Sequence, residues 1–539
     1  MEAVLCESLE ETILAIKIIL LIIFFGVMIF IGFWSRRHAT NVNDYVLGGR
    51  TVGPWLTAFA FGTSYFSSVV FVGYAGQFGW KFGLASTWIG LGNALIGSLL
   101  AWIILGRRTR IMTQKLDART MPEYFGKRYD SQSLQVVGSI ISFVFLVPYT
   151  AGVYNGLSRL FGMAFSIDYH VVIIIMALLT AVYVIAGGYM ATALNDFIQG
   201  IIMLFGISAV IAAVLHGQGG FLNAMKELSI IDASDVAKPA LQGAEGLLTS
   251  FFGPDPLALL GVVILTSLGT WGLPQMVQKF YAIKDEKSVQ TGTVISTFFA
   301  FVVAGGCYFL GGFGRLFGDV PGVHNEDGSI AFDAIIPSML STLPDILIGI
   351  VIVLVLSASM STLSSLVLTS SSTMTLDFLK KTFWQDMSEK TQLIVMRVLI
   401  AVFIVISVAL AFNPPAFIAQ MMGVSWGGLA GAFLAPFMYG LYSKNVTKLS
   451  VWVSFAWGVL FTVMNMFFHY IASPINAGAI TMIVGLILVP LVSLITPKMD
   501  EKEMDDLFAV YDEEVVVHKS HSLQEGVVKS VRAVKAKED

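Results

Sequence analysis

Charged residues and cysteines are both scarce in this chain. Asp, Glu, Lys and Arg make up 13% of its 539 residues, whereas 56% are hydrophobic and the mean hydropathy is +0.78. This composition excludes an ordinary soluble protein and indicates an integral membrane protein. The two cysteines, Cys6 and Cys307, lie far apart in the sequence, so no disulfide framework is implied.

Motifs for nucleotide chemistry are also lacking. No GxxxxGK[ST] loop occurs, so a pump driven by ATP would lack its phosphate cradle. None of the longer polar segments resembles a kinase or a metal site. We therefore predict that the chain is not an enzyme, binds no nucleic acid and has no obligate protein partner, and that its energy source is not ATP.

Apolar segments of about 18 to 25 residues are abundant, and each is long enough to cross roughly 30 Å of hydrocarbon as a helix. We count about thirteen by this length criterion, which predicts an all-α integral membrane protein in the lipid bilayer. The segments are 12–34, 54–79, 85–105, 134–162, 170–187, 191–215, 247–272, 291–317, 333–375, 392–413, 416–441, 449–471 and 478–496.

The distribution of basic residues predicts the orientation of the chain. The acidic head MEAVLCESLEE is unlike a cleavable signal peptide, so the first segment is expected to be retained. Basic residues gather in alternate loops, which the positive-inside rule places in the cytoplasm, with the N-terminus outside and the C-terminus inside a plasma membrane. These residues are Arg36, Arg37, Arg50, Arg107, Arg108, Arg110, Lys115, Arg119, Lys127, Arg128, Lys279, Lys284, Lys287, Lys380, Lys381, Lys390, Lys444 and Lys448.

Ionisable residues are rare inside the apolar segments, and Asp196 is the most informative of them. A buried acid at membrane depth costs roughly 2.5 to 3.5 kcal/mol on insertion scales, so a partner or a bound ion is expected. The alternative is a hydrated Asp196 at the headgroup boundary, without a role.

A cluster of hydroxyls lies in the stretch SASMSTLSSLVLTSSSTMT, residues 357–375. Ser361, Ser364 and Ser365 share one helix face, and oxygen ligands beside a carboxylate suit a hard cation such as sodium. The alternative is close helix packing, with hydroxyls bonded back to their own helix. For residues 370–373 we favour packing, and for 358–365 the residues leave both interpretations open.

Two apolar segments contain helix breakers at matching positions. Gly62, Thr63 and Ser64 interrupt the second segment, and Gly269, Gly272 and Pro274 interrupt the seventh. Each break opens a set of five helices, and paired interrupted helices are typical of inverted-repeat transporters with a midplane site. The residues therefore predict an ion-coupled secondary transporter.

Four motifs, spread over residues 43–445, resemble the sodium/solute symporter family: NDYVLGGRTVGPWLTAFAFGTSYFSS, LDARTMPEYFGKRY, AGGYMATALNDFIQG and SASMSTLSS. The resemblance implies a leucine-transporter-like core with a five-plus-five inverted repeat. The implied organisation is an extracellular N-terminus (1–11), an extra helix (12–34), the core (53–442), two further helices (447–496) and a cytoplasmic tail (497–539).

The resemblance also implies ligands for the coupling ion, Na+. A first sodium site would use the carbonyls of Thr63, Phe66 and Ala358 and the side chains of Ser361 and Thr362. Some members add a second sodium site. Its counterparts in this chain are Asp196, Ser361, Ser364 and Ser365.

The expected solute pocket is formed from Ser67, Tyr149, Trp271, Ser425 and Trp426. The pattern of proline-transporting members is only partly present. Their acidic residue in the broken helix is Tyr65 here, their following tryptophan is Val69, and their aromatic pair aligns with Thr266 and Thr270. No arginine near Tyr149 matches the one that sialic acid transporters use.

These features predict a sodium-coupled symporter that imports a small organic solute, such as proline, another small amino acid or a monocarboxylate. The alternatives are a proton-coupled symporter acting through Asp196, a transporter-like membrane sensor and a passive channel. The short tail, without a recognisable output domain, argues against the sensor.

Overall fold

The computed structural model describes residues 2–36, 41–165 and 167–512. Within these residues the fold is a bundle of helices, and two isolated β-bridges are the only extended pairings. The predicted all-α class is confirmed. Arg37 and the tail beyond residue 512 lie outside the described residues.

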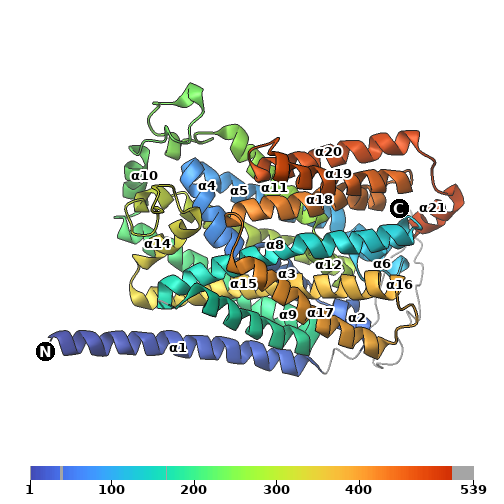
Figure 1. The fold of residues 1–539 in the computed structure, drawn as a ribbon, viewed down its shortest axis with the longest axis horizontal. Helices are drawn as coiled ribbons and strands as arrows, with labels where there is room; N and C mark the ends of the chain where they lie inside the picture. The colour runs from blue at the N-terminus through green and yellow to red at the C-terminus, as the bar shows by residue number, and fades with distance from the viewer. Residues whose placement is uncertain (1, 37–40, 166, 513–539) are drawn as a thin grey trace, which may run out of the picture.

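The long helices run side by side along the horizontal axis of Figure 1. They are α1 (Glu2–Ser35), α8 (Gln132–Phe165), α9 (Tyr169–Gly217), α11 (Pro256–Gly272), α13 (Glu286–Gly311), α15 (Asp345–Thr373), α17 (Glu389–Phe412), α18 (Ile418–Tyr442), α19 (Lys448–Phe468) and α20 (Pro474–Ile495).

Shorter helices extend or connect these long ones, together with 3-10 and π-helical turns such as 69–74 and 93–100. They are α2 (Val42–Leu47), α3 (Pro54–Tyr65), α4 (Ala75–Phe82), α5 (Thr87–Gly92), α6 (Arg107–Lys115), α7 (Met121–Arg128), α10 (Phe221–Ser229), α12 (Pro274–Ala282), α14 (Ile335–Ser341), α16 (Lys380–Thr382) and α21 (Glu501–Phe508).

Ten helical stretches of the described residues are long and apolar enough to cross a membrane, or up to eleven if the bent pair α11–α12 forms one span. The predicted count of thirteen is not confirmed. The stretches Val69–Lys115 and Tyr169–Gly217 each contain parts of two predicted segments. Each passes through a glycine with positive φ, Gly83 (59°) and Gly188 (57°), a conformation in which glycine allows a sharp turn without a Cβ clash.

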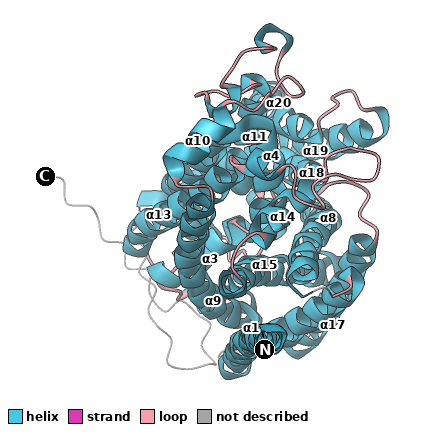
Figure 2. Ribbon diagram, turned by 90° about the vertical axis from the view of Figure 1, so that its left-hand side faces the viewer, coloured by secondary structure: helices cyan, strands magenta, loops and turns pink. Residues whose placement is uncertain are grey.

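The helices that the sequence places outside the core lie on opposite sides of the bundle. Helix α1 lies along one edge beside α9 and α15, while α19 and α20 lie along the other, beside α18 (Figures 1 and 2). Large apolar side chains of α1, such as Phe30 and Ile22, are exposed. A lipid-facing helix has this character. The five-plus-five repeat itself stays a prediction.

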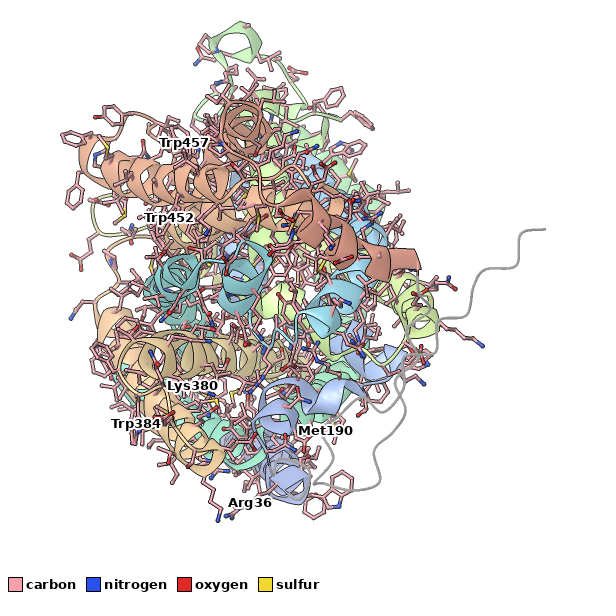
Figure 3. The ribbon with its side chains drawn as sticks, turned by 90° about the vertical axis from the view of Figure 1, so that its right-hand side faces the viewer. Arg36, Met190, Lys380, Trp384, Trp452 and Trp457 are labelled. Carbon is pink, nitrogen blue, oxygen red and sulfur yellow. The ribbon has the colours of Figure 1, made fainter. Side chains whose placement is uncertain are left out.

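One end of the bundle carries Arg36 and Lys380, two of the residues predicted to face the cytoplasm (Figure 3). Which end faces the cytoplasm stays a prediction. Lys279, however, is not a loop residue as the basic-residue pattern suggested. It lies in α12 with only 3% of its side chain exposed, because the chain re-enters helix at Pro274 instead of leaving the bundle.

Candidate functional site

The first broken helix supplies backbone groups at the centre of the bundle. Helix α3 begins at Pro54 and ends at Tyr65. The following residue, Phe66, has an extended backbone (φ −107°, ψ 97°) that takes its carbonyl out of the helical pattern. The break therefore lies a few residues after the predicted Gly62. Gly62 itself permits close packing, because a Cβ there would lie 2.3 Å from the Phe299 ring.

The second predicted break lies at Leu273 (φ −85°, ψ 120°), where α11 and α12 meet at 47°. Pro274 is the first residue of α12, a position that tolerates its missing N–H. Gly269 and Gly272 remain helical and serve packing. A Cβ on Gly269 would lie 2.5 Å from the Trp426 ring, and one on Gly272 would lie 2.8 Å from the Ala430 backbone.

Four of the five predicted ligands of the first sodium site converge between α3 and α15. The Ser361 hydroxyl lies 3.1 Å from the Thr63 carbonyl and 3.1 Å from the Ala358 carbonyl. The Thr362 hydroxyl lies 3.2 Å from each of the same two carbonyls. All four residues are buried. We call these residues the neutral oxygen cluster, because none of them carries a formal charge.

Phe66, the fifth predicted ligand, is three residues after Thr63 in the sequence, and its side chain is buried. No hydrogen bond in the described residues joins Phe66 to the neutral oxygen cluster, so its role as a ligand stays a prediction. Carbonyl and hydroxyl oxygens are the donors that hard cations prefer. The donor set of this cluster therefore fits a sodium ion.

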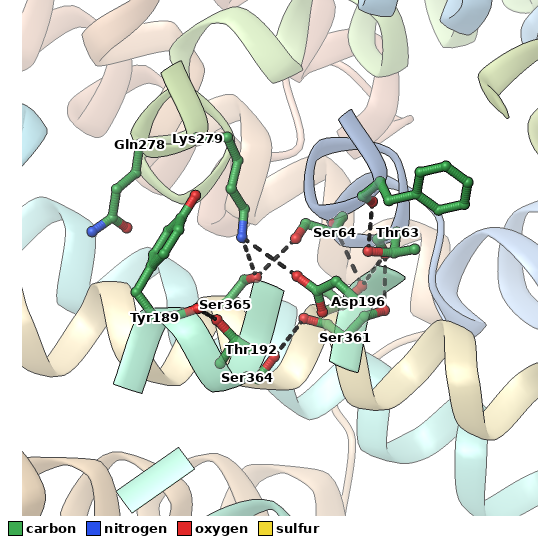
Figure 4. A network of polar contacts seen from close by, with 12 residues as sticks. Thr63, Ser64, Tyr189, Thr192, Asp196, Gln278, Lys279, Ser361, Ser364 and Ser365 are labelled. Atoms are coloured by element: carbon green, nitrogen blue, oxygen red, sulfur yellow. Dashed lines mark hydrogen bonds and ion pairs between the residues drawn. The ribbon is translucent and has the colours of Figure 1, made fainter. Parts of the chain in front are cut away.

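Asp196, Lys279, Ser365 and Ser64 form a second polar group beside the first (Figure 4). The Lys279 ammonium donates to the Ser365 hydroxyl at 2.9 Å and lies 3.8 Å from a carboxylate oxygen of Asp196. Ser365 and Ser64 share a hydrogen bond of 2.8 Å. Helices α9, α12, α15 and α3 each contribute one side chain. We call this group the charged cluster.

Asp196 is completely buried, so the alternative of a hydrated residue at the headgroup boundary does not fit the structure. Neither of its carboxylate oxygens accepts a hydrogen bond, and its partner is the Lys279 ammonium. Ser364 donates to the carbonyl of Ser361 at 2.8 Å, which ties it to its own helix. A sodium ion bound by Asp196, Ser361, Ser364 and Ser365 stays a prediction.

Sequence reasoning missed Lys279, because a lysine shortly after an apolar segment is typical of a cytoplasmic loop. The available signal was the stretch PQMVQKFYA, whose first residue follows a helix break and whose last residues are apolar. That stretch could have been read as the second half of a bent span.

Three of the four hydroxyls of residues 370–373 are bonded back to their own helix, as the packing interpretation predicts. Ser371, Ser372 and Thr373 donate to carbonyls three residues earlier in their own helix, at 3.0 to 3.1 Å. The buried Ser370 hydroxyl has no hydrogen-bond partner. This end of α15 is a packing surface.

Two of the predicted solute-pocket residues meet. The Tyr149 and Trp426 rings pack edge to face with their centres 5.8 Å apart, and the centre of the Tyr65 ring lies 6.2 Å from that of Trp426. The indole N–H of Trp426 is buried without a hydrogen-bond partner. Tyr65, which takes the place of the acidic residue of proline-transporting members, donates instead to the Thr266 carbonyl.

The other three predicted pocket residues are already engaged. Ser425 donates to the Phe145 carbonyl at 2.6 Å, and Trp271 donates to the Ile96 carbonyl at 3.0 Å. Ser67 accepts from the backbone of Val69 at 3.1 Å, which helps to restart the helix after the break. Their contact with a solute stays a prediction.

The polar clusters contain no donor set for a transition metal. Among the described residues, no three His, Cys, Asp or Glu side chains gather in one place. The chemistry available at the centre of the bundle is therefore that of hydroxyls, carbonyls and one carboxylate–ammonium pair.

Comparison with known proteins identifies the family of this chain. The model of the "Sodium:solute symporter family" matches residues 45–452. The osmoregulated proline transporter OpuE of Bacillus subtilis (strain 168) is 30% identical over 447 residues, which cover 82% of this chain and 85% of that protein. A sodium/proline symporter of Staphylococcus aureus (strain JH9) is 30% identical over 500 residues, 90% of this chain and 93% of that protein.

Among solved structures, a Na+-coupled sialic acid symporter in a substrate-bound outward-open state has a TM-score of 0.70 at 17% identity. The match covers 90% of this chain and 99% of that one, so the two proteins share a fold. The family and its named relatives are transporters and not enzymes, as predicted. The chain is a multi-pass membrane protein and a member of the sodium:solute symporter family.

Proposed function

We propose that this protein imports a small organic solute together with sodium, by alternating access across the plasma membrane. The observation that carries the proposal is the neutral oxygen cluster, in which two carbonyls and two hydroxyls converge between the broken helix α3 and α15. The family membership supports sodium as the coupling ion. The N-terminus is proposed to lie outside and the C-terminus in the cytoplasm.

The hydroxyls of the cluster explain how binding of the ion would act on the protein. Ser361 and Thr362 donate to the carbonyls of Thr63 and Ala358. A bound sodium ion would draw the lone pairs of all four oxygens inward and tie α3 to α15. Because α3 ends beside the proposed solute pocket, this tie would also fix the Tyr65 and Phe66 end of the helix.

The solute is proposed to bind against Tyr149 and Trp426, with Ser67, Trp271 and Ser425 near it. Two relatives are named for proline, so proline is the first candidate and a short monocarboxylate the second. Tyr65 and Val69 replace the acidic residue and the tryptophan of proline-transporting members, which makes another small amino acid a third candidate. By linkage, a sodium ion that raises solute affinity is itself bound more tightly when the solute is present.

The test is uptake by the purified protein in proteoliposomes, with labelled proline, other small amino acids and short monocarboxylates. An inward sodium gradient is expected to drive accumulation of one compound, and an equal potassium gradient is expected to drive none. Accumulation that follows a proton gradient without sodium would favour the proton-coupled alternative. Equilibration without accumulation would indicate a passive channel.

A further inference from the structure

The charged cluster contains a positive charge that belongs to the protein. Lys279 and Asp196 are both almost fully buried, at 3% and 0% exposed, and they lie 3.8 Å apart. The ammonium also donates to Ser365 at 2.9 Å and lies 5.3 Å from the centre of the Tyr189 ring. Its surroundings, a carboxylate, a hydroxyl and an aromatic face, are those that stabilise a buried cation.

The ammonium lies among the residues of the second sodium site that the resemblance to the family implies. That site would consist of Asp196 with Ser361, Ser364 and Ser365, and the ammonium contacts two of these four residues. Figure 4 shows Lys279 reaching from α12 toward Asp196 and Ser365. Each of these two residues therefore already has a positively charged neighbour.

The charged cluster is electrically neutral as it stands, so it does not attract a further cation by net charge. One carboxylate is matched by one ammonium, and the serines add no formal charge. A sodium ion entering the same group would meet the repulsion of the ammonium at close range, where the low local dielectric strengthens it. The neutral oxygen cluster, one helical turn away on α15, has no such resident charge.

We propose that Lys279 acts as a built-in cation in place of a second sodium ion, so that the protein binds one sodium ion per transport cycle. This inference rests on the proposed function, because it takes the neutral oxygen cluster as the site of the first ion. Lys279 thus determines ion stoichiometry. The contacts of Lys279 with Asp196 and Ser365 also hold α12, the second half of the bent pair, to α9 and α15.

Direct sodium binding tests the inference without knowledge of the solute. The full-length purified protein in detergent is titrated with radioactive ²²Na+ to saturation, and the number of ions per protein is counted. We expect one ion for the natural protein and two for Lys279→Met, which removes the charge and keeps most of the side-chain length. Lys279→Arg keeps the charge and is expected to bind one ion.

The double variant Lys279→Met, Asp196→Asn distinguishes two causes of extra sodium binding by Lys279→Met: removal of the ammonium charge, or additional space in the site. Without the carboxylate, the second site has no charge for sodium, so one ion is expected. Lys279→Gln replaces Lys279→Met if the latter does not elute as a single species in gel filtration. Thermal unfolding of Lys279→Met is also expected to shift upward in sodium chloride relative to potassium chloride, by more than that of the natural protein.

Two results would overturn the inference. The first is binding of two ions by the natural protein, and the second is binding of one ion by a well-folded Lys279→Met and Lys279→Gln. A different result, no sodium binding by the natural protein, would contradict the proposed function itself. The stoichiometry and the existence of sodium coupling are therefore tested separately.

Discussion

Two polar clusters share α15 and differ in one respect, the presence of charge. The neutral oxygen cluster offers carbonyls and hydroxyls of Thr63, Ala358, Ser361 and Thr362, whereas the charged cluster pairs Asp196 with an ammonium. Both are buried, and both join α15 to α3. The comparison teaches that burial and oxygen content alone do not define an ion site, because a resident ammonium changes the local charge that a sodium ion would meet.

The difference has consequences for transport energetics. One sodium ion entering with the membrane potential supplies about 2.3 kcal/mol per 100 mV, and two ions supply about twice as much. By the rule of about 1.4 kcal/mol per factor of ten, one ion supports roughly 50-fold accumulation of a neutral solute from 100 mV alone. The identity of residue 279 would therefore set the steepest gradient that the carrier can build.

The largest expected effect comes from breaking the charged cluster on one side only. Asp196→Asn leaves the Lys279 ammonium buried without a counter-charge, which is expected to cost about 3–5 kcal/mol of stability. The double variant Lys279→Met, Asp196→Asn removes both charges and is expected to recover most of this loss. Thermal unfolding in detergent, with sodium absent, measures both. Additive losses in the double variant would contradict the pairing.

A second buried acid provides a contrast to Asp196, since it has no buried ammonium in contact. Asp333, which precedes the membrane-spanning stretch Leu347–Thr382, is 2% exposed and accepts from the Ile418 backbone at 3.3 Å. Burial raises the pKa of Asp333 to about 6, although the charge of Arg159 opposes this shift. Since the folded state favours the protonated acid, this group lowers stability as pH rises from about 4 to 6.

The variant Asp333→Asn removes that penalty. We expect it to raise stability by up to about 3 kcal/mol at pH 7 and above, with no gain below pH 4. The measurement is the difference in unfolding temperature between variant and natural protein from pH 4 to 8. A difference that is the same at every pH would show that ionisation of Asp333 is not its cause.

In the neutral oxygen cluster, Thr362→Ala deletes one oxygen and little volume. The loss of a contact to a charged ion is expected to raise the sodium concentration for half-maximal uptake by roughly ten- to hundredfold, with little change in stability. The measurement is uptake as a function of sodium in proteoliposomes that contain equal amounts of folded protein. Normal sodium activation of this variant would remove Thr362 from the ion site.

The smallest effect is expected from a matched control on the same helix. Ser372 donates to the Thr369 carbonyl at 3.0 Å, within its own helix, and it is buried. Ser372→Ala is expected to leave the sodium dependence within twofold of the natural protein. A shift as large as that of Thr362→Ala would indicate that any lost hydroxyl on α15 disturbs uptake.

The sequence by itself determined the all-α membrane fold and the family, and the resemblance to that family pointed to the residues of the neutral oxygen cluster. Apolar length identifies a spanning helix because lipid leaves the backbone no partner except itself. The spacing that places Ser361, Ser364 and Ser365 on one helix face is likewise a local property. The ligand roles of Thr63, Ala358 and Thr362 were identified through the resemblance to the family.

Only the tertiary structure decided the partner of Asp196. Lys279 lies 83 residues further along the chain, and a basic residue after an apolar segment is typical of a cytoplasmic loop. The chain instead bends by 47° and continues as α12, which carries the ammonium inward to the carboxylate. Hydropathy reports how apolar a segment is, whereas charge pairing depends on which helices meet, and packing alone fixes that.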